Sequence, residues 1–233
     1  MTTTPNFGDK PIVALATDYD GTLAEDGLVS ETTLEALKRF KADKRSLILV
    51  TGRVLPELKA LFAELDVFDI VIAENGALLY WPKSEEVRLL APPPPPGFVE
   101  KLHELGVGPI SIGHCIVATW TPHENAVLEA IKDMQLELSI IFNKGAVMIL
   151  PTSVNKASGL KAALAALDLH ASETIGFGDA ENDLAFLKMC GFSVAVSNAL
   201  DSVKQAANWT SDGTRGRGVT EVLNELLSVT ARA

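Results

Sequence analysis

The stretch that decides the fold is VALATDYDGTLAEDG, residues 13–27, in which an apolar run leads into two aspartates two positions apart. Residues 11–17 are almost entirely apolar, which is typical of a buried β-strand. Asp18 and Asp20 are expected to point to the same side, because side chains two apart share one face of an extended chain. Gly21 then lets the chain turn away sharply, and Thr22 can hold the turn or the second carboxylate by a hydrogen bond. The stretch therefore predicts a strand that presents two carboxylates at its end.

Strands and helices alternate outward from this stretch. We expect helices at 30–43 and 55–65, strands at 46–52 and 69–76, and a hairpin at 77–90. The same alternation returns later, with a helix at 155–167, a strand at 173–179, a helix from about 181, a strand at 192–196 and a final helix near 219–229. Apolar strands separated by helices predict a parallel sheet that is covered on both faces.

Five consecutive prolines at 92–96 interrupt this alternation, because proline ends helices and cannot pair within a sheet. Beyond them, helices are expected at 97–105 and 123–134, and strand pairs at 109–121 and 136–151. That order predicts a small α+β unit with a sheet of its own. We therefore predict an α/β, Rossmann-like core of residues 1–91 and 153–233, with a small α+β domain of residues 92–152 inserted into it.

Composition narrows the classes of partner. Of the 233 residues, 47% are hydrophobic and 21% are charged, as in soluble globular proteins, and the net charge is −10. This charge repels nucleic acid and anionic membranes, so neither is expected as a partner. No apolar run approaches the length of a membrane span and the N-terminus does not resemble a signal peptide, so we expect a cytoplasmic protein. Cys115 and Cys190 lack metal-site spacing and are expected to be buried small side chains.

Polar residues and glycine follow four of the predicted core strands, at the strand ends where ligands bind in open α/β sheets. The four ends are Asp18 to Thr22, Thr51 to Arg53, Glu74 to Gly76 and Gly178 to Asp183. One such end is an ordinary turn, but four indicate a site. The aspartates at 18, 20, 179 and 183 would repel one another unless a cation joined them, and Mg²⁺ suits carboxylates combined with phosphate oxygens.

These groups are the parts that phosphoryl transfer needs. The Thr51 hydroxyl, backbone amides and Lys156 at a helix start can hold and polarise a phosphoryl group. Asp18 can accept that group as an aspartyl-phosphate, which splits one displacement into two easier steps. Asp20 can protonate the leaving oxygen and then deprotonate the attacking water. The opening pair of aspartates is therefore interpreted as a nucleophile and an acid/base.

Four motifs in order, DYDGTL (18–23), TGR (51–53), NKASGL (155–160) and GDAENDL (178–184), resemble those of the haloacid dehalogenase-like (HAD) superfamily of phosphohydrolases. The inserted cap, together with ENGA (74–77), resembles the Cof-like or IIB subclass, which has a C2-type cap. The likeness spans about residues 11–228. It implies the α/β core, the cap and Mg²⁺ dependence described above.

The resemblance also implies a role for each matching residue. Catalytic residues would be Asp18 as nucleophile, Asp20 as acid/base, Thr51 and Lys156; metal ligands would be Asp18, Asp20 through its backbone carbonyl, Asp179 and Asp183; Gly52, Asn75 and Asn182 would contact the phosphoryl group. Arg53 is a candidate substrate contact, with a structural role left open. Lys144, in the cap turn 143–145, is a further candidate, because caps of this subclass reach over the site with such loops.

The expected function is that of a Mg²⁺-dependent phosphatase that hydrolyses a small phosphomonoester, such as a sugar phosphate or phosphoglycolate, through an aspartyl-phosphate. The expected partner is thus a small phosphorylated metabolite, and the protein is expected to be a monomer or homodimer. Two alternatives stay open. A phosphomutase or phosphotransferase of the same superfamily would pass the phosphoryl group to another hydroxyl, and a non-catalytic phosphometabolite-binding module would bind without turnover.

Overall fold

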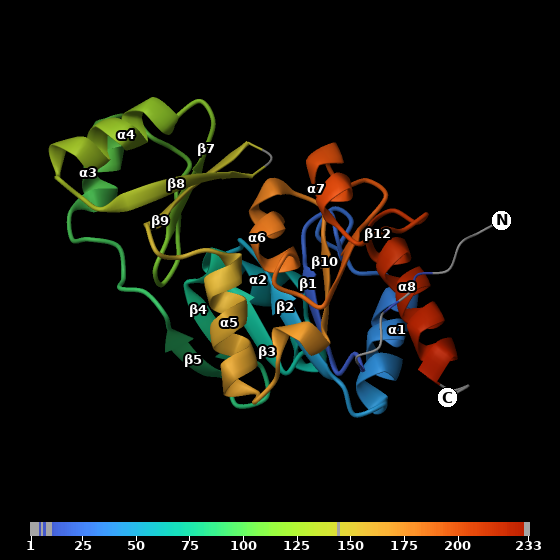
Figure 1. Ribbon diagram of the computed structural model, residues 1–233. Coiled ribbons are helices and arrows are strands. Elements are labelled where there is room, and N and C mark those ends of the chain that lie inside the picture. The colour runs from blue at the N-terminus through green and yellow to red at the C-terminus, as the bar shows by residue number, and fades with distance from the viewer. Residues whose placement is uncertain (1–4, 6, 8–10, 144, 231–233) are drawn as a thin grey trace.

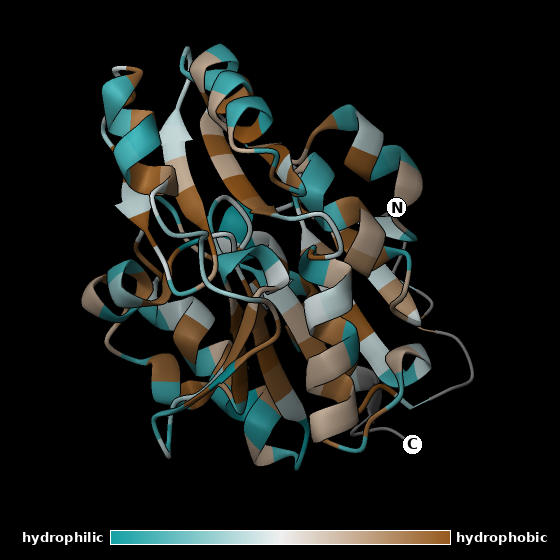
Figure 2. Ribbon diagram, turned by 90° about the vertical axis from the view of Figure 1, so that its left-hand side faces the viewer, coloured by the Kyte–Doolittle hydropathy of each residue, from teal (hydrophilic) through white to brown (hydrophobic). Residues whose placement is uncertain are grey.

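A computed structural model describes residues 5, 7, 11–143 and 145–230. It contains two sheets, one of eight strands and one of four, and each has its own helices (Figure 1). Figure 2 shows hydrophobic residues concentrated on the strands, with hydrophilic residues on the outer surfaces of the helices. The predicted combination of an α/β core with an inserted α+β unit is confirmed.

The core sheet has the order β12-β11-β10-β1-β2-β3-β4-β5. Its parallel strands are β1 (Ala14–Asp18), β2 (Ser46–Val50), β3 (Ile70–Ala73), β10 (Thr174–Gly178), β11 (Phe192–Ala195) and β12 (Trp209–Thr210). β4 (Leu78–Trp81) and β5 (Glu86–Leu89) extend one edge as an antiparallel hairpin. β1 lies inside the sheet between β10 and β2, so its carboxyl end opens toward residues from both halves of the chain.

Helices cover both faces of the core sheet (Figure 1). They are α1 (Glu31–Ala42), α2 (Leu55–Leu61), α5 (Lys156–Ala166), α6 (Leu184–Leu187), α7 (Asp201–Ala206) and α8 (Arg215–Thr230). α1 begins at the predicted cap, where the Ser30 hydroxyl accepts a hydrogen bond from the amide of Thr33. α1 packs beside α8, while α5 packs on β2 and β3 and against α6. Burying the apolar faces of these helices gives the core one continuous hydrophobic cluster.

The C-terminal part differs from the sequence-based expectation. α8 begins at Arg215 rather than near 219, and neither α7 nor β12 was expected. The glycines at 216 and 218 lie within the helix. A Cβ on Gly216 would lie 2.6 Å from the carbonyl oxygen of Leu23, and one on Gly218 would lie 2.3 Å from that of Gly213. Glycine is therefore required here by close backbone packing.

The second sheet has the order β6-β7-β9-β8 and is antiparallel throughout. Its strands are β6 (Ser111–Ile112), β7 (Val117–Trp120), β8 (Leu138–Asn143) and β9 (Ala146–Pro151), and its helices are α3 (Phe98–Glu104) and α4 (Glu124–Asp133). Val117 and Val147 face these helices in a separate hydrophobic cluster. Ala118 and Met148 face the core instead. We keep residues 92–152 as the proposed bounds of the cap.

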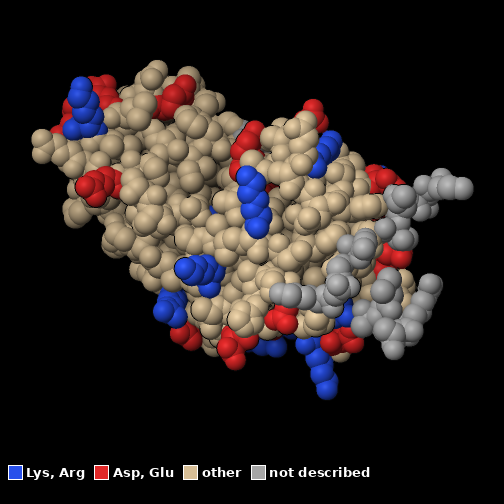
Figure 3. Space-filling view, in the orientation of Figure 1, with Lys and Arg blue, Asp and Glu red and all other residues tan. Residues whose placement is uncertain are grey.

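In the ranges that the structure describes, no helix combines the length and apolar character needed to cross a bilayer. Basic and acidic side chains are interspersed on the face of the molecule seen in Figure 3. That mixture does not resemble the one-sided basic surface of a nucleic-acid-binding domain. The expected absence of nucleic-acid and membrane partners, and the expected cytoplasmic location, stay predictions.

Candidate active site

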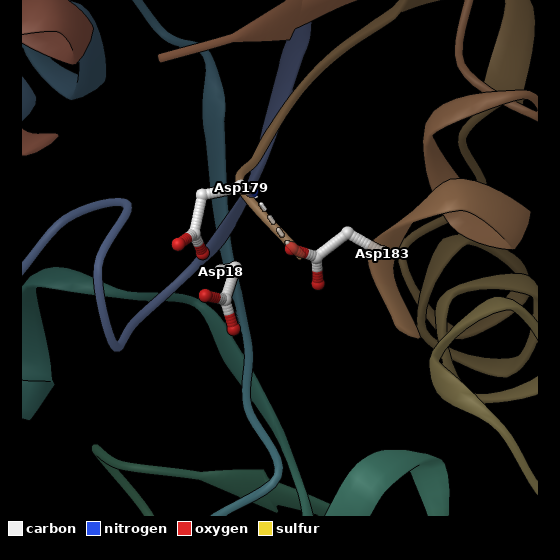
Figure 4. A group of neighbouring side chains, drawn as sticks. All are labelled: Asp18, Asp179 and Asp183. Atoms are coloured by element: carbon white, nitrogen blue, oxygen red, sulfur yellow. Dashed lines mark hydrogen bonds between the residues drawn. The ribbon is translucent and has the colours of Figure 1, made fainter. Parts of the chain in front are cut away.

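Two neighbouring strands bring together aspartates from opposite ends of the sequence. Asp18 ends β1, and Asp179 follows the last residue of β10, which pairs with β1 in parallel. Asp183 ends the 3-10 turn η4 (Glu181–Asp183), and Figure 4 shows the side chains of the three aspartates grouped together. One oxygen from each lies within 4.8 Å of the others, and all three residues are buried. Among the described residues, this is the acidic group whose geometry could hold a metal ion.

Backbone amides hold Asp183 in place. One of its oxygens, Oδ2, accepts hydrogen bonds from the amides of Asp179 at 2.9 Å and Ala180 at 3.0 Å. A Cβ on Gly178 would lie 2.7 Å from the Cβ of Asp183, so the turn requires glycine at that position. The Thr22 hydroxyl, which the opening stretch placed near a carboxylate, donates to Asp179 at 3.0 Å rather than to Asp20. Hydrogen bonds from nearby backbone amides and from Thr22 thus hold the carboxylates of Asp183 and Asp179 in place.

Lys156 supplies the positive charge within this group. It is the first residue of α5, whose N-cap, Asn155, forms a capping box with Ser158. The Lys156 ammonium lies 2.5 Å from Asp18 Oδ1 and 2.6 Å from Asp183 Oδ1, and the side chain is 1% exposed. Burial acts against its charge, but the two carboxylates outweigh that effect and raise the pKa of Lys156. This ammonium therefore stays protonated.

The surroundings of Asp18, unlike those of Lys156, disfavour its charged form. Its burial, and then the charge of Asp183, raise the pKa of the Asp18 carboxyl well above the usual value, while Lys156 acts in the lowering direction. Three buried carboxylates with one ammonium leave an excess of negative charge. Such oxygen donors fit a hard divalent cation such as Mg²⁺, which takes carboxylate oxygens together with water and phosphate oxygens. The residues present are therefore compatible with the expected metal.

The carboxylate of Asp20 is not part of the acidic group. Both of its oxygens accept hydrogen bonds from the Arg53 guanidinium, at 2.7 Å each, in the bidentate arrangement that arginine favours. This bonding to Asp20 raises the pKa of Arg53 in spite of partial burial. Asp20 as acid/base, its backbone carbonyl as a metal ligand and Arg53 as a substrate contact all stay predictions.

The other predicted phosphate-binding residues surround the acidic group. Thr51 is buried after β2, and its hydroxyl accepts the amide of Arg53 at 3.1 Å. Asn182 donates its side-chain amide to Asn75 at 3.4 Å, which leaves the Asn75 amide nitrogen and the Asn182 carbonyl buried without partners in the described part of the chain. Unpartnered buried groups of this kind are costly unless a ligand pairs with them. Lys144 lies outside the described residues, so its predicted role is untested.

A cavity of about 260 Å³ lies between the core and the cap and reaches the nucleophile candidate. Its core side includes Asp18, Asp20, Gly52 and Arg53, and its cap side includes Trp120 and Asn143. The sequence did not single out Glu57 of α2 or Ser111 of β6, whose side chains join across the cavity wall by a 2.8 Å hydrogen bond. A long-range contact of this kind leaves no local pattern in the sequence.

Comparisons with known proteins agree with this geometry. A family model described as haloacid dehalogenase-like hydrolase matches residues 15–105 and 111–223. A phosphoglycolate phosphatase of Methanothermobacter thermautotrophicus is 29% identical over 230 residues, covering 92% of this chain and 98% of that protein.

Two solved structures have the same fold. A haloacid dehalogenase-like hydrolase from Bacteroides thetaiotaomicron gives a TM-score of 0.77 at 18% identity, covering 94% of this chain and 100% of that chain. A sugar phosphatase of HAD subclass IIB gives 0.71 at 20% identity, covering 91% and 97%. The four ordered motifs, the α/β core with its inserted sheet and the family match lead to one conclusion: this chain belongs to the haloacid dehalogenase-like hydrolases.

Proposed function

We propose that this protein is a Mg²⁺-dependent phosphatase that hydrolyses a small phosphorylated metabolite through an aspartyl-phosphate on Asp18. The observation that carries the proposal is the buried group of Asp18, Asp179 and Asp183 with the Lys156 ammonium, in which Asp18 also lines the cavity under the cap. The predicted enzyme class, a phosphoric monoester hydrolase, is confirmed by the family match and the similar phosphatase. The metal, the intermediate and the individual residue roles are our proposal.

The acidic group would hold Mg²⁺ through the carboxylates of Asp18, Asp179 and Asp183. When bound there, the ion would supply positive charge close to the phosphoryl oxygens and so make phosphorus more electrophilic. Lys156 would balance the charge of Asp18 as the substrate phosphate approaches. The Thr51 hydroxyl and the Gly52 amide would orient the phosphoryl group from the end of β2.

The covalent steps follow from the side chains. A carboxylate oxygen of Asp18 attacks phosphorus, the bond from phosphorus to the ester oxygen breaks, and Asp20 gives its proton to that leaving oxygen. Water then attacks the aspartyl-phosphate, Asp20 takes a proton from this water, and phosphate departs with Asp18 restored. Both oxygens of Asp20 accept hydrogen bonds from Arg53 in this structure. The oxygen that carries the proton would have to leave the guanidinium, while the other stays paired and fixes the direction in which the carboxyl group points.

The lining of the cavity favours a leaving group that donates hydrogen bonds. Within the described lining, Arg53 is the cationic side chain, and it already forms an ion pair with Asp20. Glu57 brings a carboxylate, and the side-chain oxygen of Asn143 is buried without a partner in the described chain. Hydroxyl groups can donate to both acceptors, whereas a carboxylate would be repelled by Glu57. Of the two expected substrate classes, this chemistry favours a sugar phosphate over phosphoglycolate.

Phosphate release tests the proposal. The assay would compare phosphorylated sugars, phosphoglycolate, nucleotides and a generic aryl phosphate, each with Mg²⁺ and with a chelator. We expect metal-dependent release, one ester clearly preferred, and no release from a folded Asp18→Asn variant. Activity retained in that variant would remove Asp18 as the nucleophile.

The same assay separates the alternatives. A phosphomutase or phosphotransferase would yield an isomeric or transferred ester in place of free phosphate, which product analysis detects. A binding module would bind a phosphorylated compound without converting it. Either result would overturn the phosphatase proposal, although the family membership would stand.

A further inference from the structure

Glu74 joins the core to the cap through a buried carboxylate. The residue follows β3 of the core, and its side chain is fully buried. Its oxygens accept hydrogen bonds from three consecutive amides in the turn between β6 and β7: His114 at 2.8 Å, Cys115 at 2.8 Å and Ile116 at 3.3 Å. The ring nitrogen Nδ1 of His114 lies 3.1 Å from the same carboxylate. The turn of the cap thus encloses a side chain of the core.

The fit between the turn and the carboxylate is close. A Cβ on Gly113 would lie 2.5 Å from the carboxyl carbon of Glu74, which is less than real Cβ contacts allow. Any larger residue at 113 would displace either the turn or the carboxylate. Because the donors are backbone amides, the contact fixes the path of the cap chain rather than one side chain of it.

The segment that carries Glu74 also contacts the proposed catalytic groups. Glu74, Asn75 and Gly76 have φ values of 53°, 56° and 103°, so all three are left-handed. The Asn75 amide donates to the carbonyl of Thr51, and its side chain meets that of Asn182. A Cβ on Gly76 would lie 2.0 Å from the carbonyl oxygen of Asn155, the residue before Lys156. Three consecutive residues therefore contact the cap turn, the asparagine pair and the start of α5.

We propose that Glu74 is a positioning residue that sets where the cap sits over the phosphoryl site. A buried carboxylate is costly unless hydrogen bonds compensate it, and an apolar pair at this junction would carry no such cost. In return, the charge imposes one position of the turn, because only that position brings the amides to both oxygens. The strands on either side of the turn carry Ser111 and Trp120, which line the cavity, so moving the turn moves the cavity wall.

Hydrogen exchange measured by mass spectrometry tests the contact without relying on activity. In Glu74→Ala, the amides of residues 114–116 should exchange at least tenfold faster than in the wild-type protein, while amides of the core strand β1 stay protected. The matched control is His114→Ala, which removes the ring but keeps the three backbone amides and should leave their protection unchanged. Unchanged exchange in Glu74→Ala would overturn the proposal.

The kinetic test rests on the proposed function. It compares kcat/KM for the preferred ester of the phosphate-release panel with that for a generic aryl phosphate, which relies less on the cap. Glu74→Ala should lower the first at least tenfold, mainly through KM, and the second less than threefold, and Glu74→Gln, which keeps one acceptor oxygen, should recover part of the loss. A loss of folded protein would lower both values equally, so an equal fall for both substrates would refute a positioning role.

Gly113→Ala approaches the same contact from the cap side. Its added methyl should cause the same faster exchange and the same loss of kcat/KM as Glu74→Ala. The double variant should show no larger change than Glu74→Ala, because removal of the carboxylate leaves room for the methyl. Fully additive losses would show that the two residues act separately and would contradict the proposal. If no substrate is ever found, the exchange results still decide the contact, so failure of the proposed function is distinguishable from failure of this inference.

Discussion

Lys156 is the residue on which the acidic group depends. Its ammonium contacts Asp18 and Asp183, and the Lys156 side chain is almost fully buried. Removing one partner of a buried ion pair strongly destabilises the folded protein, because the other charge is left buried and uncompensated. The same lysine therefore has both a structural and a proposed catalytic role.

Lys156→Met should lower the free energy of unfolding by about 3–5 kcal/mol in metal-free buffer, since Asp18 and Asp183 lose their counter-charge. Chemical denaturation measures this change. Adding Mg²⁺ should restore part of the loss, because a cation that binds the folded state stabilises it. Unfolding that is unchanged by the substitution would mean that these carboxylates do not need the lysine in the metal-free protein.

Arg53→Ala should lower kcat about tenfold to a hundredfold, because Asp20 loses the bidentate contact that orients it. Arg53→Lys keeps the charge without the planar guanidinium, and its kcat should lie between that of Arg53→Ala and that of the wild-type enzyme. Steady-state kinetics distinguishes a residue that orients Asp20, which affects kcat, from one that contacts the substrate. A rise in KM with an unchanged kcat would instead make Arg53 a substrate contact.

Much of the site was predictable at this scale because local motifs carry it. Asp18 ends β1, and Asp179 and Asp183 lie in the segment that follows β10, so the parallel pairing of these two strands brings the three residues together. The pairing of Asp20 with Arg53 was not predictable, since it joins residues 33 positions apart that follow two different strands. Glu74 belongs to the ENGA stretch (74–77), but its contact with the cap depends on how the two sheets meet and leaves no local pattern.

At the scale of elements, α5 is held close to β3 by glycine. A Cβ on Gly159 would lie 2.5 Å from a side-chain methyl of Ile72 and 2.7 Å from the Cα of Gly76. The helix that carries Lys156 can approach the sheet this closely only because position 159 has no side chain. The position of Lys156 therefore depends on Gly159, which lies about one turn further along α5.

Gly159→Ala should destabilise the protein by about 1–3 kcal/mol, although the same change in an open helix gains about 1 kcal/mol from helix propensity. It should also lower turnover, because α5 must move away from β3 and take Lys156 with it. Thermal unfolding and kinetics check both effects. Lys161→Ala, at an exposed site on the same helix, is the control and should change stability by less than about 0.5 kcal/mol.

Sequence patterns predicted the long elements better than the short ones. The apolar strands and α1, with its serine cap, were recognisable because each carries a repeated signal. α7 and β12 are too short for such a signal and are held by packing at the edge of the sheet. The start of α8 was missed because its glycines look like a turn, whereas in the fold they allow close backbone approach, of Gly216 to Leu23 and of Gly218 to Gly213.

At the scale of the whole molecule, the cap was predictable as an insertion, because the proline run and the change in element order mark its first boundary. Its orientation over the core was not, because the contacts of Glu74 and of Glu57 with Ser111 join residues far apart in the sequence. A small apolar cluster, which includes Val54, Cys115 and Met148, also fills the junction. The cap therefore presents a defined surface to the site.

Replacing residues 92–152 by a short linker should keep slow, metal-dependent hydrolysis of a generic aryl phosphate and remove discrimination among metabolites. The acidic group lies entirely in the core, whereas the outer cavity wall belongs to the cap. Phosphate release from the same panel measures the change, and circular dichroism checks that the core still folds. Selectivity that survives the deletion would place the specificity in the core.

The position of β1 inside the sheet also affects how the chain is made. Ribosomes release the N-terminal strands first, so β1 can pair with β2 while its other neighbour, β10, has not yet been synthesised. The cap segment emerges in between, and the delay is on the order of ten seconds. Throughout that time one edge of the strand that bears Asp18 is open to wrong partners. The emergence of β10 (Thr174–Gly178) from the ribosome and its pairing with β1 therefore end this exposure and bring Asp179 beside Asp18.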